Sequence, residues 1–571
     1  MAQTKSKSRF LALLFLVAAC TRQPAPLPPP QIPDRFVASG YLGMVATADE
    51  RASAAGVQML EAGGNAVDAF AAASFAVSVT RPQSTGIGGG GFAVLYLQPP
   101  GKPVKQLAVD FRERAPGRAT RDMCNQPGQS EDACRSGPLS VGTPGLVGGV
   151  LDIHARYGRL SRQQILAPAI ELADLGFPVY KHLSKSIAEV APLLARYPES
   201  AGIFMPDGAV PKPGEVLRQP DLAETLRQIA KEGARPFYQG HIAEEIAAEM
   251  QRQGGLVDRK DLASYRVIDR AALVGQYRGY EVITMPPPSS GVLLLEMMNM
   301  LTLAGPAATL PASADRYHLL AEVMRRGYED RAKYLGDPDF VAVPVSQLLS
   351  PEYAAQRFAD YDPARATLRP DLPPAQIKPT STTHISILDA EGNAVAATET
   401  VNYTFGSGIT VPGTGILLNN EMDDFAARPG VPNLYGLVGT DANAIAARKT
   451  PLSSMSPTIL VRDGQPMLLA GSPGGSLIIT ATLQTILNTV DLQMALPQAV
   501  AQARVHHQAI PNVLLFEKGA LNDEIAADLR RRGHVLREIP SMGNVQAVAQ
   551  TPLGEKIGVS DPRGEGQPAG Y

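Results

Sequence analysis

The feature that most constrains the fold is a pair of alternating segments joined by a turn within residues 382–402. Residues 382–388 and 394–402 both show the two-residue period of a β-strand, and residues 389–393 are turn formers. If Leu388 and Ala394 close this hairpin, counting outward places Thr382 opposite Thr400. The pattern therefore predicts two hydroxyl groups that face each other across a strand pair.

A threonine in this position has two interpretations. Threonine is a good strand residue, and Thr–Thr pairs are ordinary in sheets. Alternatively, Thr382 is a nucleophile, which a cut just before it would activate because the new α-amine could act as its base. Three later segments favour the second interpretation. They are polar, small or glycine-rich, they border apolar runs as loops around one pocket do, and they lie at residues 419–425, 451–457 and 471–476.

Composition indicates a globular protein. A chain of 571 residues with 44% hydrophobic and 19% charged residues can bury a large core or two lobes. The net charge of −3 and the lack of a concentrated basic segment predict no nucleic-acid partner. The histidines are scattered and no zinc-type Cys/His spacing occurs, so the sequence predicts neither a metal site nor a cofactor.

The N-terminus has the pattern of a targeting segment. A basic stretch at residues 5–9 precedes an apolar run at 10–19 that is too short to span a bilayer. The following Cys20 completes a segment similar to a bacterial lipobox, in which the cysteine is lipidated after the signal peptide (1–19) is removed. Because Thr21 is not the aspartate that marks inner-membrane retention, we expect an outer-membrane anchor facing the periplasm. A plain secretory signal with an incidental Cys20 is the alternative.

Two consequences follow for an exported chain. Residues 20–37 are rich in proline and would form a stiff tether between the lipid and the folded protein. Cys124 and Cys134 lie in one polar loop, and in an oxidising compartment a disulfide between them is reasonable. Two free loop thiols are the alternative.

The remaining chain predicts a layered α/β protein. A glycine-rich segment at 86–91 has the letters of a GxGxxG motif, but a helix precedes it and a strand (92–97) follows, so we expect close backbone packing rather than a nucleotide site. Residues 145–375 are expected to be mainly helical, interrupted by a rigid proline loop, and residues 362–381 to be accessible. The predicted helices are 49–62, 66–79, 146–157, 161–175, 222–232, 242–253, 314–334 and 478–490.

The segments that border the predicted pocket resemble the gamma-glutamyltranspeptidase family, and the likeness extends over nearly the whole chain after about residue 38. It also includes residues 63–69, 88–92, 110–113 and 285–291. The resemblance implies the four-layer αββα sandwich of N-terminal-nucleophile hydrolases. It further implies self-cleavage between Ser381 and Thr382, which leaves a large subunit (38–381, with a helical insertion) and a small catalytic subunit (382–571) that stay together. The freed amine, with a reference pKa of about 7.7–8.0, would be the general base.

The resemblance also assigns site residues. Thr400 matches a second threonine bonded to the nucleophile, Gly474 and Gly475 match the oxyanion hole, and Tyr435 matches the aromatic residue of a lid formed by the connection after Asp424. An arginine fork suits the α-carboxylate of a γ-glutamyl group, and acidic acceptors suit its α-ammonium. The residues at these head-group positions are Arg112, Ser453 and Ser454 for the carboxylate, and Asp424, Glu421 and Asn402 for the ammonium.

The implied activity is hydrolysis of glutathione or related γ-glutamyl donors and transfer of the γ-glutamyl group to an amino acid or dipeptide. Two rivals remain. A related acylase acting on glutaryl-cephalosporin would have a substrate without an α-ammonium, so Asp424 argues for γ-glutamyl donors. An inactive surface lipoprotein would not need the complete set of site residues.

Overall fold

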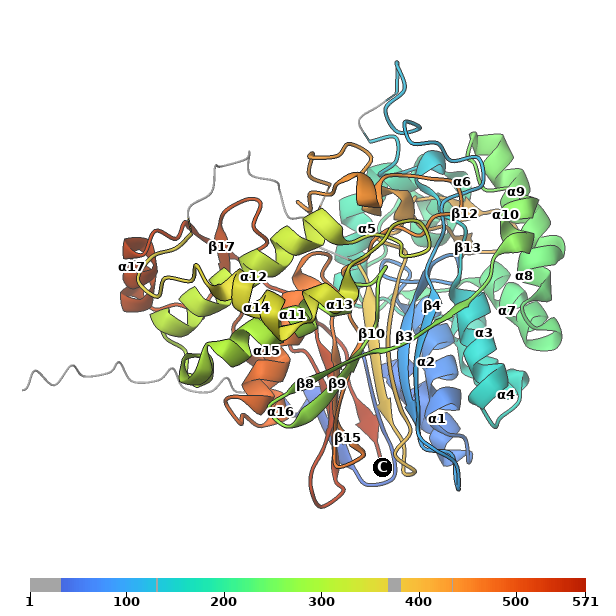
Figure 1. Cartoon of the computed structure of the whole chain (residues 1–571). Helices are drawn as coiled ribbons and strands as arrows, with labels where there is room; N and C mark the ends of the chain where they lie inside the picture. Colours follow the sequence, from blue (N-terminus) through green and yellow to red (C-terminus); the bar gives the residue numbers. More distant parts are fainter. Residues whose placement is uncertain (1–31, 130–131, 368–380, 434) are drawn as a thin grey trace, which may run out of the picture.

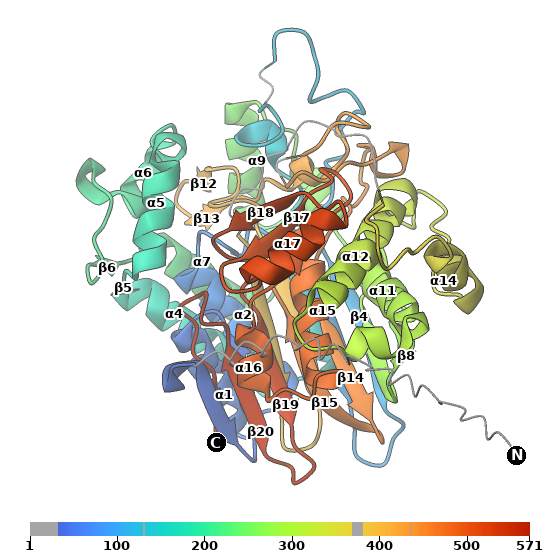
Figure 2. The ribbon, with the colours of Figure 1, turned by 90° about the vertical axis from the view of Figure 1, so that its left-hand side faces the viewer.

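The computed structural model describes residues 32–129, 132–367, 381–433 and 435–571. Two seven-stranded sheets stack face to face, and helices cover both outer faces (Figure 1 and Figure 2). The predicted signal peptide, Cys20 and most of the tether lie outside the described residues. No helix within the described ranges is long and apolar enough to cross a membrane.

The first sheet combines strands from both sides of the predicted cut. Its strand order is β1-β20-β19-β15-β14-β9-β8. The bounds are β1 Val37–Gly40, β8 Leu273–Tyr277, β9 Tyr280–Thr284, β14 Thr458–Arg462, β15 Gln465–Gly471, β19 Gln546–Gln550 and β20 Lys556–Ser560.

The second sheet contains the predicted hairpin at its centre. Its order is β21-β2-β10-β11-β3-β4-β7. The bounds are β2 Met44–Thr47, β3 Gly90–Leu97, β4 Lys105–Phe111, β7 Ile268–Arg270, β10 Thr383–Leu388, β11 Ala394–Thr400 and β21 Ala569–Gly570. Strands β10 and β11 pair antiparallel with Leu388 opposite Ala394, which confirms the predicted register.

The remaining strands of the described residues form three small sheets. They are β5 (Phe177–Pro178) with β6 (Val216–Leu217), β12 (Thr410–Val411) with β13 (Ile416–Leu417), and β16 (Val505–His506) with β17 (Leu514–Glu517) and β18 (Leu536–Ile539).

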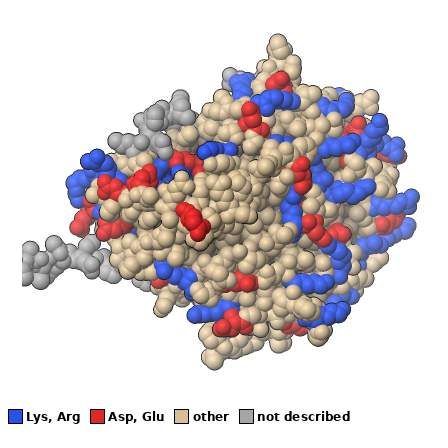
Figure 3. Space-filling view, viewed as in Figure 1, with Lys and Arg blue, Asp and Glu red and all other residues tan. Residues whose placement is uncertain are grey.

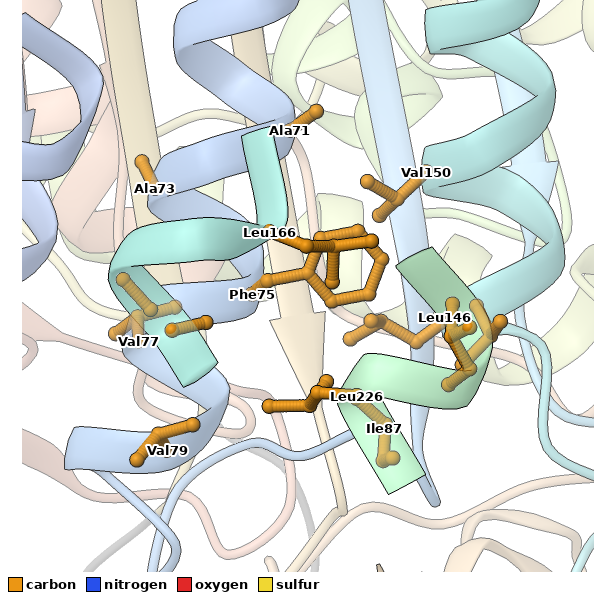
Figure 4. Close-up of a cluster of buried hydrophobic side chains, with 14 of the residues drawn as sticks. Ala71, Ala73, Phe75, Val77, Val79, Ile87, Leu146, Val150, Leu166 and Leu226 are labelled. Atoms are coloured by element: carbon orange, nitrogen blue, oxygen red, sulfur yellow. The ribbon is translucent and has the colours of Figure 1, made fainter. Parts of the chain in front are cut away.

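Helices on the second sheet bury an apolar core against it. Helix α2 is buried on every side, and Figure 4 shows its Phe75 among Leu146, Leu166 and Leu226. Asn65 caps α2 with a capping box, as its sequence predicted. The helices of this half are α1 Glu50–Glu61, α2 Ala66–Thr80, α3 Leu146–Tyr157, α4 Arg162–Leu175, α5 Lys181–Leu194, α6 Pro198–Phe204, α7 Pro220–Glu232, α8 Arg235–Gln239, α9 His241–Gln253 and α10 Arg259–Ser264.

A second group of helices covers the first sheet. They pack on its outer face through a separate apolar core. Their bounds are α11 Gly291–Leu303, α12 Ala314–Tyr334, α13 Val345–Leu348, α14 Pro351–Phe358, α15 Leu477–Val490, α16 Leu496–Ala501 and α17 Asp523–Arg531. Between the sheets lies a third core, to which Phe92 and Val94 contribute from one side and Ile459 and Leu469 from the other. The layers are therefore α, β, β and α, as expected.

The mainly helical region also contains strands that the sequence reasoning did not predict. Strands β7, β8 and β9 connect its two groups of helices, and β8 pairs with β9 through Tyr277 and Tyr280. The two turn residues, Arg278 and Gly279, both have positive φ (50° and 82°). An Arg-Gly turn lacks the Asn-Gly or Asp-Gly signature of such hairpins, which is why the turn was missed.

The glycine-rich segment packs tightly against the hairpin, as expected. A Cβ on Gly89 would lie 2.1 Å from the Thr400 carbonyl oxygen, and one on Gly88 would lie 2.2 Å from the Leu417 carbonyl oxygen. Side chains at these positions would push β11 and its neighbours away. The glycines therefore allow close approach of backbone next to the predicted nucleophile.

Two further features bear on the site. Cys124 and Cys134 form the expected disulfide, and they pack with Met422 and Phe425 beside the loop that carries Asp424. Lys, Arg, Asp and Glu side chains are interspersed over the face seen in Figure 3. Because both sheets contain strands from before and from after residue 381, a cut there would leave two pieces that share both sheets.

Candidate active site

The two hydroxyls predicted to face each other do so. Thr382 directly precedes β10, and its Oγ1 lies 3.0 Å from Oγ1 of Thr400 at the end of β11. Both side chains are buried, with 5% and 3% of their surface exposed. The register of a single hairpin therefore brings the pair together.

Both hydroxyls also contact the peptide carbonyl that joins Ser381 to Thr382. Thr382 Oγ1 donates to the Ser381 oxygen, and Thr400 Oγ1 lies 3.3 Å from the same oxygen. The backbone N–H of Asn402 donates to Thr400 Oγ1 at 2.8 Å. Because this bond occupies a lone pair of Thr400, the Thr400 proton is left for the carbonyl or for Thr382. The arrangement polarises this one peptide bond.

The nearby histidine and glutamate are not placed to act as the base. His384 is fully buried, contacts Thr398 Oγ1 at 2.8 Å and Ser386 Oγ at 3.1 Å, and burial lowers its pKa to about 3. Glu399 accepts a hydrogen bond from Ser74 at 2.7 Å, and burial raises its pKa to about 7. Since side chains alternate along β11, Glu399 points away from the side that carries Thr400.

Arg112 lies at the opposite end of the site, just after β4. Its Nη2 is 2.5 Å from Asp424 Oδ2 and 2.7 Å from Glu421 Oε1, and its Nε donates to the Pro451 carbonyl at 3.1 Å. The resemblance assigned Arg112 and Asp424 to opposite charges of a substrate. In this structure the two side chains pair with each other.

Three carboxyl groups surround this single arginine. Burial raises the pKa of Glu113 to about 7 and that of Glu421 well above its usual value. Burial disfavours the Arg112 cation, but the carboxyls of Glu421 and Asp424 hold its pKa above the ordinary value. Burial therefore favours the neutral form of Glu113 and Glu421, whereas the nearby Arg112 cation favours their charged form.

Ser453 and Ser454 belong to the loop that leads into β14. Both are buried, and the backbone N–H of Met455 donates to Ser453 Oγ at 3.1 Å. This bond leaves the Ser453 hydroxyl proton for another acceptor. Both serines line the same cavity as Arg112, so hydroxyl donors and the guanidinium converge.

Gly474 and Gly475 precede α15, and both adopt φ values that favour glycine (143° and 54°). A Cβ on Gly475 would lie 2.2 Å from the Tyr435 ring, which covers it. Tyr435 is itself buried, and its hydroxyl donates to Asn402 Oδ1 at 2.9 Å. The segment after Asp424 therefore closes over the cavity through Tyr435.

One small cavity of about 20 Å³ gathers nearly all of the predicted residues. Of the residues assigned to nucleophile, head group, oxyanion hole and lid, Gly474 does not line the cavity itself but adjoins Gly475. The lining residues are Arg112, Thr382, Thr400, Asn402, Glu421, Asp424, Tyr435, Leu437, Ser453, Ser454, Met455, Gly475 and Ile478.

Sequence reasoning missed three residues beside this cavity. Glu113 adjoins Arg112 in the 110–113 segment, but the sequence does not predict that the Glu113 side chain is buried. Ser290 lies in the 285–291 segment, to which no role was given. Arg331 lies on α12, a helix rich in charged residues. Several of these are buried in the structure, which the sequence does not predict.

Comparison with known proteins agrees with this geometry. A family model described as gamma-glutamyltranspeptidase matches residues 52–571. The glutathione hydrolase proenzyme of Escherichia coli is 43% identical over 528 residues, which cover 91% of this chain and 90% of that protein. The cephalosporin acylase structure from Bacillus halodurans aligns with a TM-score of 0.84 at 30% identity, covering 96% of this chain and 99% of that one. The Helicobacter pylori gamma-glutamyltranspeptidase structure aligns with a TM-score of 0.53 at 38% identity, covering 56% of this chain and 91% of that one. The chain therefore belongs to the gamma-glutamyltranspeptidase family.

Proposed function

We propose that this chain is a self-cleaving proenzyme that hydrolyses γ-glutamyl donors such as glutathione and transfers their γ-glutamyl group. The observation that carries the proposal is the contact of two threonine hydroxyls with the Ser381 carbonyl. Family membership supports the same activity. The nucleophile is Thr382.

The cleavage step uses the groups already in contact. Thr382 Oγ attacks the Ser381 carbonyl carbon, and the C–N bond breaks as its nitrogen takes up the hydroxyl proton. The product is an ester between Ser381 and Thr382 Oγ. Water then hydrolyses this ester, which leaves a carboxylate on Ser381 and a free α-amine on Thr382. Thr400 stabilises the charge that develops on the Ser381 oxygen.

The mature enzyme repeats this chemistry on a donor. The α-amine of Thr382 takes the hydroxyl proton, and Oγ attacks the γ-carbonyl carbon. Backbone N–H groups of Gly474 and Gly475 stabilise the tetrahedral oxygen. The proton passes to the departing amine, and a γ-glutamyl ester of Thr382 remains. Water or an acceptor amine then attacks the ester and releases the threonine.

Asp424 distinguishes a γ-glutamyl donor from a glutaryl one, because only the former has an α-ammonium. The acylase alternative has support in the Bacillus halodurans structure. The test compares kcat/KM for a γ-glutamyl anilide and a glutaryl anilide. We expect a clear preference for γ-glutamyl that Asp424→Asn reduces. Equal rates in the wild-type enzyme would favour the acylase, and no activity on either donor would favour an inactive scaffold.

Tyr435 acts in this proposal as the lid of the pocket. Its buried ring shields the acyl-enzyme from part of the water while an acceptor amine enters beside it. Transfer should therefore rise over hydrolysis when glycylglycine is added at alkaline pH, where the acceptor amine is unprotonated. An unchanged product ratio would contradict this role.

The proposed location is the periplasm, with a lipid anchor on Cys20 in the outer membrane. The support is the lipobox-like sequence and the proline-rich tether. Cys20→Ser should release the protein from the membrane fraction without loss of activity. Retention of the variant in membranes would contradict the anchor.

A further inference from the structure

Arg331 is a buried arginine that contacts the loop carrying the head-group serines. It lies near the end of α12 with 5% of its surface exposed. Its Nη2 donates to Ser454 Oγ at 3.2 Å, and its Nε donates to Ser290 Oγ at the same distance. Neither partner carries a charge.

Several buried arginines of the described residues are neutralised by carboxylates, whereas Arg316, like Arg331, donates only to uncharged oxygens. Arg504 pairs with Asp561 at 2.8 Å, and Arg326 pairs with Glu322 at 2.5 Å. Among the residues that the structure describes, Arg331 forms no ion pair within 4.0 Å, and the carboxylate that acts on it electrostatically is Asp424, which pairs with Arg112. Burial lowers its pKa to about 10, so the side chain remains charged at neutral pH. A buried cation in this setting favours an anion that arrives from outside.

Ser290 extends the contact to the second serine. Its hydroxyl accepts from Arg331 and donates to the Ser453 carbonyl at 2.5 Å. The N–H of Ser453 donates to the Pro288 carbonyl at 2.8 Å. The proline loop at 285–291 therefore holds the serine loop in place, and Arg331 joins the two.

The hydrogen-bond directions decide what Ser454 offers. Because its oxygen accepts from Arg331, its own O–H remains available to donate. Donation by a cation polarises that O–H and makes it a stronger donor. Ser454 and Arg112 line the same cavity, so the Ser454 proton and the Arg112 guanidinium can meet one carboxylate.

We propose that Arg331 is a positioning residue for the α-carboxylate of the donor. It fixes Ser454 directly and Ser453 through Ser290, and it adds a second positive charge behind the serine loop. This charge allows Arg112 to share the carboxylate while Asp424 turns to the ammonium. The inference rests on the proposed γ-glutamyl function.

The same face of α12 also contacts the loop that carries Gly474 and Gly475. Tyr328, one turn before Arg331, donates its hydroxyl to the backbone carbonyl of Ser476, which follows Gly474 and Gly475. Helix α12 precedes the cleavage point, whereas both loops follow it. A helix of the large subunit therefore contacts two loops of the small subunit, the one with Ser454 and the one with Ser476.

The test measures dependence on the donor carboxylate. Arg331→Met removes the charge at similar length, and Lys333→Met removes an exposed charge from the same helix as a matched control. Each variant is assayed with γ-glutamyl-p-nitroanilide and with 4-aminobutyryl-p-nitroanilide, which keeps the amine but lacks the α-carboxylate. For Arg331→Met we expect kcat/KM for the γ-glutamyl donor to fall by about 10- to 100-fold, mainly through KM, since charge-assisted hydrogen bonds have about this strength. Activity on the 4-aminobutyryl donor should change little, and Lys333→Met should match the wild type on both.

Two further variants keep the proposal falsifiable if Arg331→Met does not fold. Arg331→Lys should restore part of the loss, because one charged donor remains. Ser290→Ala leaves the guanidinium in place and should raise KM for the γ-glutamyl donor alone. Equal losses on both donors would show a merely structural role and overturn the proposal, as would unchanged kinetics. A wild-type enzyme without γ-glutamyl activity would instead contradict the proposed function.

Discussion

The two ends of the cavity are built in different ways. At the nucleophile end, Thr382 and Thr400 are 18 residues apart and meet through one hairpin. At the head-group end, Arg112 and Asp424 are 312 residues apart, and Arg331 and Ser454 are 123 residues apart. The first end depends on strand register, whereas the second depends on packing between distant loops and α12.

This difference separates two activities. Self-cleavage needs the contacts among Ser381, Thr382 and Thr400, all of which lie within one short segment. Donor binding needs those groups and also the distant head-group residues. Substitutions at the head-group end should therefore impair catalysis on donors and spare self-cleavage, whereas substitutions at the nucleophile end should impair both.

Apart from removal of the nucleophile itself, the largest effect is expected for Thr400→Val. The variant keeps the side-chain shape and removes the hydroxyl beside the Ser381 oxygen, so self-cleavage should slow by about 10²-fold or more, as for loss of an oxyanion donor. Gel electrophoresis over time gives the rate. Thr398→Val is the matched control on the same strand, because its hydroxyl contacts His384 instead, and it should still be cut. Normal cleavage of Thr400→Val would break the comparison.

Arg112→Met should show the opposite pattern. Self-cleavage should proceed, because the Ser381 carbonyl makes no contact with the guanidinium. We expect kcat/KM for a γ-glutamyl anilide to fall by about 10²-fold, through loss of charge-assisted bonds to the carboxylate. The two readouts are the band pattern and steady-state kinetics. An uncut Arg112→Met chain would mean that the two ends are not separable.

Glu399→Gln tests the buried carboxyl next to Thr400. The native pKa of about 7 exceeds the ordinary 4.5, so the folded protein retains a proton that the unfolded chain loses. The contribution of Glu399 to the free energy of unfolding should therefore fall by about 3 kcal/mol as pH rises from about 4.5 to 7. The glutamine variant should lack this contribution. Denaturant unfolding at pH 5 and pH 8, in a Thr382→Ala background that remains one chain, provides the measurement. An identical pH dependence in both proteins would exclude Glu399 as the source.

Tyr435→Phe should have the smallest effect. The ring still covers Gly475, and only the hydrogen bond to Asn402 is lost. A neutral hydrogen bond of about 1 kcal/mol corresponds to a change of about fivefold in KM for the donor. Self-cleavage should be unaffected. A change much larger than this would indicate that the Tyr435 hydroxyl contacts the substrate itself.

Sequence reasoning succeeded where a local rule governs the structure. The hairpin register followed from the two-residue period, and the α2 cap and the tight glycine packing followed from residue type. The pairing of Arg112 with Asp424 and the burial of Arg331 could not be predicted, because they depend on how separate layers dock. The resemblance supplied the identities of most head-group residues, but the 285–291 segment acquired a role only when the structure placed Ser290 between Arg331 and Ser453.

The identity of the nucleophile is the central claim, and the intact mass of purified protein tests it most directly. The wild-type chain should give two polypeptides, the smaller of which begins at Thr382. Thr382→Ala, which lacks the attacking hydroxyl but keeps the hairpin, should give one uncut chain without activity on a γ-glutamyl anilide. Cleavage of purified Thr382→Ala at the same peptide bond would contradict the account.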